Sequence, residues 1–293
     1  YWILDSLKPW IDRSITIYDI QAFIWKAYVV AFAFTIIAEL PFIFILMRRK
    51  KHAIIRTLIA SLIIQSLSYC GIYYWYYSAS YDSLFRKTII VQSFKTQHPQ
   101  STLYFLGEDQ NIYQMRLDGS EQKMIYEPQN KQELMKLYLQ RSSTGAHLCI
   151  CDVTDFYTER EENRMVVKEN VLPPDQLDVL SIEEHQMVMT EAIDFRPPEE
   201  KQWEFSTGFW AAQGLILWNQ QTQDYYGIGL ETPFAEWYVR SATVLPGDEI
   251  IFQFGPQICI YSHQTKQISL LAKGTSPVVI YNPNTATSNN STE

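Results

Sequence analysis

Three side chains near the middle of the chain have the types and the spacing of a metal site. His147, Cys149 and Cys151 alternate in the segment AHLCICDV. Alternate residues of a β-strand point to the same face, so one imidazole and two thiols could contact a single ion such as Zn²⁺. The residues between them are apolar as well, as in a strand that is buried on both faces: Ala146, Leu148 and Ile150. We therefore expect a core strand and predict no bound metal, with a metal site as the alternative.

No other segment has a motif that predicts catalysis or cofactor binding. The sequence lacks a Gly-rich phosphate loop, a G-x-S-x-G elbow, and the H-E-x-x-H, C-x-x-C and EF-hand patterns. Its carboxylates gather in short polar runs, which we interpret as solvated loops: Glu159, Glu161, Glu162, Glu183, Glu184, Glu199 and Glu200. We assign no catalytic residue and no cofactor, and we predict a protein that is not an enzyme.

Two apolar runs precede these segments, and each is long enough to form a helix that spans a bilayer. They cover residues 22–47 and 53–79, and about 20 residues suffice for one crossing. The short link between them predicts an antiparallel transmembrane hairpin within residues 21–80. Four cations in this link place it on the cytoplasmic side and both flanks outside the cytoplasm: Arg48, Arg49, Lys50 and Lys51. A buried helical hairpin of a soluble protein is the alternative.

A carboxylate, Glu39, lies within the first apolar run, about 12 Å along the helix from its cytoplasmic end. An unpaired carboxylate at this depth is costly, so we expect it to be protonated or hydrogen-bonded and to face protein. Steps of three and four place polar side chains on one face of each helix, and an antiparallel hairpin sets Glu39 opposite Ser61 and Gln65. The predicted intramembrane polar contacts are Thr35, Glu39, Arg56, Ser61, Gln65 and Ser68. The alternatives for Glu39 are a contact with a partner subunit and proton transfer.

Aromatic side chains crowd the opposite end of the second run, at its predicted outer boundary. The predicted interfacial belt consists of Tyr73, Tyr74, Trp75, Tyr76 and Tyr77. Tyr and Trp prefer the headgroup level of a bilayer, where the ring is buried and the polar tip stays hydrated. The belt is compatible with a bound lipid, and a platform for a pigment or quinone is the alternative. We expect residues 1–20 to lie along the same interface.

Residues 84–293 have the composition of an ordinary soluble domain with an acidic balance. They contain 16 Lys and Arg against 27 Asp and Glu, a net charge of −11. An acidic surface repels phosphate backbones, so we exclude nucleic acid as a partner. The last residues, 282–293, are polar and lack apolar anchors, and we expect a disordered tail.

Short apolar runs separated by turn residues predict an all-β domain over residues 84–281. One helix is expected within it, over residues 130–141, where Leu134, Leu137 and Leu139 supply apolar contacts. The overall fold class is therefore a membrane-anchored α+β protein, with a two-helix hairpin followed by an extracytoplasmic β-domain.

An internal repeat is visible in this domain. The segments IYQMRLDGSEQKMIY, LILWNQQTQDYYGIGL and ICIYSHQTKQISLLA each lead from an apolar strand through a polar turn to a second strand. Residues 102–126 and 242–281 resemble blades of the TolB and WD40-like β-propellers, although the WD dipeptide is absent. This resemblance implies a propeller-like domain of four or five blades. An incomplete propeller and a β-sandwich stay open, and the hairpin resembles no family that we assign.

These features together predict a non-enzymatic accessory, assembly or scaffolding subunit of a larger membrane protein complex. Its expected partners are other membrane-protein subunits and the lipid bilayer, and its β-domain is expected on the periplasmic or lumenal side. The alternative is a membrane-tethered enzyme or ligand-binding sensor that uses a propeller pocket.

Overall fold

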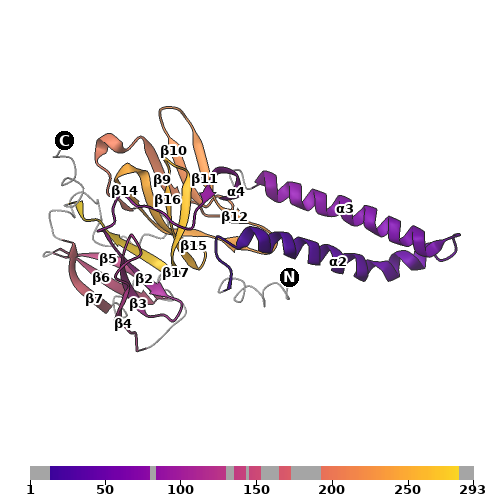
Figure 1. Cartoon of the computed structure of the whole chain (residues 1–293), viewed down its shortest axis with the longest axis horizontal. Coiled ribbons are helices and arrows are strands. Elements are labelled where there is room, and N and C mark those ends of the chain that lie inside the picture. The colour runs from indigo at the N-terminus through magenta and orange to yellow at the C-terminus, as the bar shows by residue number, and fades with distance from the viewer. Residues whose placement is uncertain are drawn as a thin grey trace.

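The computed structural model describes residues 14–79, 84–129, 135–142, 145–152, 165–172 and 193–283. Two long apolar helices extend from one end of an all-β domain, as Figure 1 shows. Helix α2 covers Ile20–Met47 and helix α3 covers Ala53–Ala79, with a short turn between them. The two helices expected from the sequence are confirmed. A helix α4 of one turn, Leu84–Lys87, leads from α3 into the domain.

The largest sheet of the described residues has nine strands and a curled, half-barrel shape (Figure 1). Its hydrogen-bonded order is β4-β3-β2-β17-β16-β15-β14-β8, and β1 pairs with β17 in parallel. These strands are β1 (Ile89–Ile90), β2 (Thr102–Gly107), β3 (Ile112–Arg116), β4 (Lys123–Tyr126), β8 (Ile193–Asp194), β14 (Val239–Leu245), β15 (Glu249–Phe254), β16 (Gln257–Ser262) and β17 (Gln267–Ile280).

Three smaller sheets complete the described part of the domain. One is a meander of β5 (Met135–Ser142), β6 (Gly145–Asp152) and β7 (Met165–Leu172). The second is a meander of β9 (Trp203–Thr207), β10 (Leu215–Asn219) and β11 (Tyr225–Ile228). The third pairs β12 (Leu230–Glu231) with β13 (Glu236–Trp237). Short 3-10 turns cover Pro198–Glu200 and Pro246–Asp248.

The helix expected over residues 130–141 is wrong in its described part, because residues 135–142 form strand β5. Leu137 and Leu139 are both buried, and they pair with Ile150 and Leu148 of β6. Residues two apart share a face of a strand but lie on nearly opposite faces of a helix, so the spacing of the two leucines fits a strand. Residues 130–134 lie outside the described part of the chain.

The central strands are buried on both faces and separate two hydrophobic cores. Ile251 and Ile260 face the first core, which also contains residues of β5, β6 and β2. Their neighbours Phe252 and Tyr261 face the second core, which contains Leu215 and Leu217 of β10. Because successive strand residues point to opposite faces, the two cores share one sheet. The base of the helical hairpin is attached to the second core.

Strand β17 joins the two halves of the large sheet. Its first part pairs with β16 through Lys273, and its second part pairs with β2 from Gly274 onwards. Gly274 has a φ of 151°, and a Cβ atom there would lie 2.2 Å from the carbonyl oxygen of Leu106. Only glycine allows the two backbones to approach this closely, so this residue fixes the place where β17 changes partner.

The three repeated segments each form an antiparallel hairpin: β3–β4, β10–β11 and β16–β17. In each turn, the side chain that opens it accepts a backbone N–H two or three residues later. Asp118 accepts from Ser120 at 2.8 Å, Asn219 from Gln221 at 2.9 Å, and Ser262 from Thr265 at 3.3 Å. These local bonds satisfy backbone groups that have no strand partner at the turn.

Candidate functional site

The hairpin meets the β-domain through the residues that lead into α2. Ile15, Ile17, Ile20 and Ile24 are buried in the second core. The backbone N–H of Ile17 donates to Gln257 Oε1 at 3.0 Å, which anchors this segment to β16. Ile15, Ile17 and Ile20 belong to the segment 1–20 that we expected along the interface. Residues 1–13 of this segment lie outside the described part of the chain. The contacts hold the two helices in a defined direction relative to the domain.

One more contact ties α2 to the domain, through two aromatic rings. The rings of Tyr28 and Phe234 meet edge-on, with centroids 5.2 Å apart. Phe234 lies in the loop between β12 and β13, where the N–H of Phe234 donates to Thr232 Oγ1 at 3.2 Å. An edge-to-face pair of this kind adds about 0.5–1.5 kcal/mol beyond the area that it buries.

A pocket of about 260 Å³ lies at this junction, and we call it the junction pocket. Both helices and the domain contribute to its walls: Gln21, Ile24, Trp25, Tyr28, Tyr73, Tyr76, Tyr77, Phe85, Arg86, Leu230, Glu231 and Thr232. Five of these side chains are Trp or Tyr residues of the helices, and three of those are members of the expected aromatic belt. Aromatic side chains therefore make up half of the lining residues, and two lining residues are charged.

The two charged groups of the junction pocket have opposite signs and belong to different elements. Arg86 belongs to α4, and its guanidinium carbon lies 4.4 Å from the centroid of the Tyr77 ring. Glu231 belongs to β12, and its Oε2 accepts the backbone N–H of Ala212 at 3.0 Å. The pKa of the nearby Tyr238 hydroxyl is raised, first by burial and then by the charges of Glu236 and Glu231. Glu231 therefore supplies the negative charge of the pocket, and Arg86 supplies the positive charge.

The rest of the aromatic belt surrounds the same end of the hairpin. Tyr73, Tyr74, Trp75 and Tyr77 are exposed on α3, and Tyr76 is partly buried. The four cations of the turn lie at the other end and are exposed: Arg48, Arg49, Lys50 and Lys51. Belt and cations are therefore separated by the full length of the helices.

The polar side chains expected between the helices fall into three groups. Thr57, Ser61 and Gln65 are buried on the face of α3 that meets α2. Thr35 makes the bond that crosses the hairpin, because its Oγ1 lies 2.9 Å from the hydroxyl of Tyr69. Arg56 and Ser68 are exposed.

Glu39 is partly buried beside this seam. Within the described part of the chain, no hydrogen bond or ion pair joins its carboxylate to Ser61, Gln65 or Arg56. The hydroxyls of Thr57 and Ser61 are buried there without a partner as well. The polar faces of the two helices thus lie along the helix contact, but the hydrogen bond that crosses it joins Thr35 to Tyr69.

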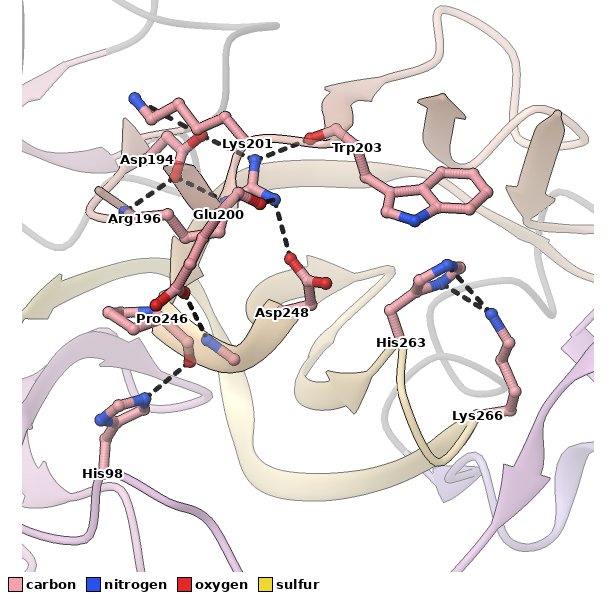
Figure 2. A network of polar contacts seen from close by, with 11 residues as sticks. His98, Asp194, Arg196, Glu200, Lys201, Trp203, Pro246, Asp248, His263 and Lys266 are labelled. Atoms are coloured by element: carbon pink, nitrogen blue, oxygen red, sulfur yellow. Dashed lines mark hydrogen bonds and ion pairs between the residues drawn. The ribbon is translucent and has the colours of Figure 1, made fainter. Parts of the chain in front are cut away.

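A buried arginine organises a second polar cluster, which lies inside the domain (Figure 2). Arg196 is 1% exposed and binds Asp194 through two nitrogens, at 3.0 Å and 2.8 Å. It also donates to Asp248 Oδ1 at 2.7 Å and to the carbonyl of Trp203 at 2.7 Å. Burial alone would lower the pKa of Arg196, but the bonds and charges of Asp194 and Asp248 outweigh it and raise the pKa. These bonds fasten β8 and β9 to the Pro246–Asp248 turn.

Next to this cluster, His263 lies between Trp203 and Lys266, as Figure 2 shows. Its ring centroid is 4.4 Å from that of Trp203 and 5.5 Å from that of Tyr226. Lys266 Nζ lies 2.9 Å from His263 Nδ1 and 4.3 Å from the centroid of Tyr226. Burial, followed by the charges of Lys266 and Arg196, lowers the pKa of His263 to about 4. A neutral imidazole can accept from the ammonium group of Lys266, whereas a protonated one cannot.

His147, Cys149 and Cys151 share one face of β6, and both thiols are buried. His147 Nδ1 accepts the backbone N–H of Asn170 at 3.1 Å, and the Cys149 thiol donates to Gln140 Oε1 at 3.3 Å. In the described ranges, no group of three His, Cys, Asp or Glu side chains could hold a metal ion. The acidic loops at residues 159–162 and 183–184 lie outside those ranges.

Sequence reasoning did not find Arg86 and Glu231, the charged members of the junction pocket. Glu231 is a single carboxylate in a short strand, and Arg86 follows the belt by nine residues. The available signal was the position of Arg86 directly after a run of aromatic residues at a predicted bilayer boundary. Nothing in the sequence indicates that Glu231, so distant along the chain, lies beside it.

No protein-family model matches the sequence, and no curated protein matches it. Among solved structures, the chain is similar to the extracellular domain of a hybrid two component system protein from B. thetaiotaomicron, with 8% identity and a TM-score of 0.20. The match covers 62% of this chain and 22% of that chain, so this chain spans about a fifth of that chain's length. A similarity at this TM-score supports neither a shared fold nor a shared function.

Proposed function

We propose that the chain is a non-enzymatic accessory or scaffolding subunit of a membrane protein complex. The hairpin of α2 and α3 crosses the bilayer, with residues 48–52 on the cytoplasmic side. The β-domain lies outside the cytoplasm and contacts partners there.

The exposure and length of the helices support the membrane anchor. Helices of 28 and 27 residues are about 42 and 40 Å long, against roughly 30 Å for the hydrocarbon core of a bilayer. Their outer surface is apolar and uncovered, with Phe42, Leu46 and Leu67 each at least 70% exposed. The core helices of a soluble protein would have these side chains covered. Only a lipid or protein environment would satisfy this surface.

The blade-like hairpins support the proposal that the β-domain is propeller-like. The three hairpins have turns that a polar side chain closes in the same way, at Asp118, Asn219 and Ser262. A propeller repeats such units and presents the connecting loops as a rigid surface. This surface is the part of the domain that we expect to bind partner proteins.

The single observation that carries the subunit assignment is that the Glu39 carboxylate has no partner within the described part of this chain. In a bilayer its carboxylate lies at hydrocarbon depth, and the described part of this chain offers it no hydrogen bond or ion pair. A carboxylate in hydrocarbon is costly unless it is paired. A helix of a partner membrane protein that presents a hydrogen-bond donor at this depth would satisfy it.

Two substitutions of Glu39 test this proposal in the native membrane. Glu39→Leu removes the carboxylate and with it the ability to hydrogen-bond to a partner helix, and we expect it to abolish recovery of the partner in mild detergent. Glu39→Gln keeps a donor and an acceptor, and we expect it to retain at least part of the complex. Phe42→Leu is the matched control, because Phe42 is an exposed apolar residue of the same helix. Recovery of the wild-type protein as a lone monomer, or unchanged partners with Glu39→Leu, would contradict the assignment.

A ligand-binding sensor is the second candidate function, and the junction pocket favours it. This pocket lies between the helices and the domain, so an occupant would touch both. A ligand that binds differently in two arrangements of helices and domain shifts the balance between them. The same complex would then respond to the occupant of the pocket.

A further inference from the structure

We propose that the junction pocket binds the headgroup of a zwitterionic, amine-carrying phospholipid, such as phosphatidylethanolamine or phosphatidylcholine. In this arrangement Arg86 contacts the phosphate, and Glu231 contacts the ammonium together with the aromatic rings. This inference rests on the membrane anchor proposed above.

The position of the pocket suits a lipid that enters sideways from the bilayer. Three of its lining residues on the hairpin side, Tyr73, Tyr76 and Tyr77, belong to the aromatic belt, where Tyr and Trp mark the headgroup level. Trp25, Tyr73 and Tyr77 line the pocket and are 53%, 44% and 47% exposed, so the walls continue onto the outer surface of the hairpin. A headgroup can therefore occupy the pocket while its acyl chains stay beside the helices.

The size of the pocket selects a small group. Sites for drug-sized ligands enclose roughly 300–1,000 Å³, whereas this pocket encloses about 260 Å³. A phosphate and an amine joined by two carbons form a compact head that suits the space.

The charges of the pocket match the two charges of such a head. The guanidinium of Arg86 has five N–H donors in a planar fork, so it can remain over Tyr77 and also donate to phosphate oxygens. Glu231 uses Oε2 for Ala212, and a carboxylate has lone pairs left on both oxygens for an ammonium group. Trp25, Tyr28 and Tyr73 line the same pocket, and aromatic rings attract an ammonium or a quaternary amine. An anionic headgroup without an amine would bind Arg86, but its negative charge would be repelled by the Glu231 carboxylate.

The test is native mass spectrometry of the full chain after reconstitution in nanodiscs of equimolar phosphatidylethanolamine, phosphatidylcholine and phosphatidylglycerol. We expect the wild-type protein to retain the two amine-carrying lipids about tenfold over phosphatidylglycerol. Arg86→Gln should lose retention of all three lipids. Glu231→Gln should keep lipid but reduce the tenfold preference to about twofold or less.

Matched controls remove the same charges elsewhere on the surface. Lys95→Gln and Glu199→Gln replace exposed residues of the domain outside the pocket lining, and both should behave as the wild type. A retention ratio near one in the wild-type protein, or an unchanged ratio in Glu231→Gln, would overturn the proposal. Inorganic phosphate at equal concentration should not displace the lipid, and displacement would identify a free phosphate as the ligand instead.

Failure of this inference is distinguishable from failure of the membrane anchor. If the protein does not enter the nanodiscs at all, the anchor is wrong and this inference falls with it. If the protein enters them but shows no lipid preference, the anchor stands and only the headgroup assignment is overturned.

Discussion

Acidification is expected to destabilise this protein through one buried imidazole, that of His263. The ring is 6% exposed and lies 4.4 Å from the Trp203 ring, and Lys266 donates to it. A proton on the ring would remove the acceptor of Lys266 and place two like charges 2.9 Å apart. Burial and the charges of Lys266 and Arg196 accordingly lower the pKa of His263 to about 4.

The magnitude follows from the difference in proton affinity between the folded and unfolded chains. The unfolded chain has an ordinary histidine pKa of about 6.5, so between pH 6.5 and 4 the unfolded state binds more protons. Stability therefore rises with pH through this window, is fully present above it, and is lost as the pH falls towards 4. The shift corresponds to at most about 3 kcal/mol, of which about 2 kcal/mol is lost between pH 7.5 and 5.

The assay is denaturant unfolding of the full chain in an uncharged detergent, followed by tryptophan fluorescence at pH 7.5, 6.5, 5.5 and 5. Other groups also titrate in this range, so the informative quantity is the difference between the wild type and His263→Gln. This variant should be less stable at pH 7.5 but should lose about 2 kcal/mol less on acidification. His52→Gln removes an exposed imidazole in the hairpin turn and is the matched control. Equal losses in the wild type and His263→Gln would refute the reasoning.

Three further predictions concern the contacts that fasten the parts together. Arg196→Met should lower the free energy of unfolding by about 3–5 kcal/mol, because it leaves Asp248 without its cation and Asp194 with only Lys201 at 3.8 Å, and Arg196→Lys should recover part of this loss. Gly274→Ala should lower the melting temperature by several degrees, because its Cβ would lie against the Leu106 carbonyl. Phe234→Ala should weaken the contact with Tyr28 by about 1 kcal/mol and raise amide exchange at the junction without changing exchange in the first core.

Controls for these variants come from the same chain. Gly71→Ala introduces a Cβ that meets no atom within 4 Å, so it should leave the melting temperature unchanged or raise it. Phe209→Ala removes a ring that is 75% exposed and should not affect exchange at the junction. A destabilised Gly71→Ala, or equal effects of Phe234→Ala and Phe209→Ala, would count against the assigned contacts.

Local patterns in the sequence predict some elements of the fold, whereas the others depend on tertiary packing. The two helices follow from continuous apolar runs, and the three hairpins follow from turns such as Asp118–Gly119 between alternating strands. Strand β5 was mistaken for a helix because Leu134 and Leu137 have the three-residue spacing of one helix face, whereas Leu137 and Leu139 have the spacing of a strand face. Its pairing with β6 is what decides between them.

The candidate site is the part that the sequence could least predict. The aromatic belt can be read from Tyr73 to Tyr77, but the junction pocket combines four segments, 21–28, 73–77, 85–86 and 230–232. Placing Glu231 beside Arg86 requires β12 to lie next to the hairpin base, which depends on the packing of the whole second core. The bond of Thr35 to Tyr69 was not predicted either, because it depends on how the two helices pack against each other.

The central claim is that α2 and α3 cross a bilayer and separate the cationic turn from the β-domain. A labelling experiment with a membrane-impermeant maleimide on sealed vesicles of known orientation tests it directly. One accessible cysteine is introduced at a time, as Lys51→Cys in the turn or Gln264→Cys in an exposed loop of the domain. Each variant has a Cys70→Ser background, in which the remaining native thiols, those of Cys149, Cys151 and Cys259, are buried. The account predicts that Gln264→Cys is labelled only from the extracytoplasmic side and Lys51→Cys only from the cytoplasmic side. Labelling of both positions from the same side would contradict it.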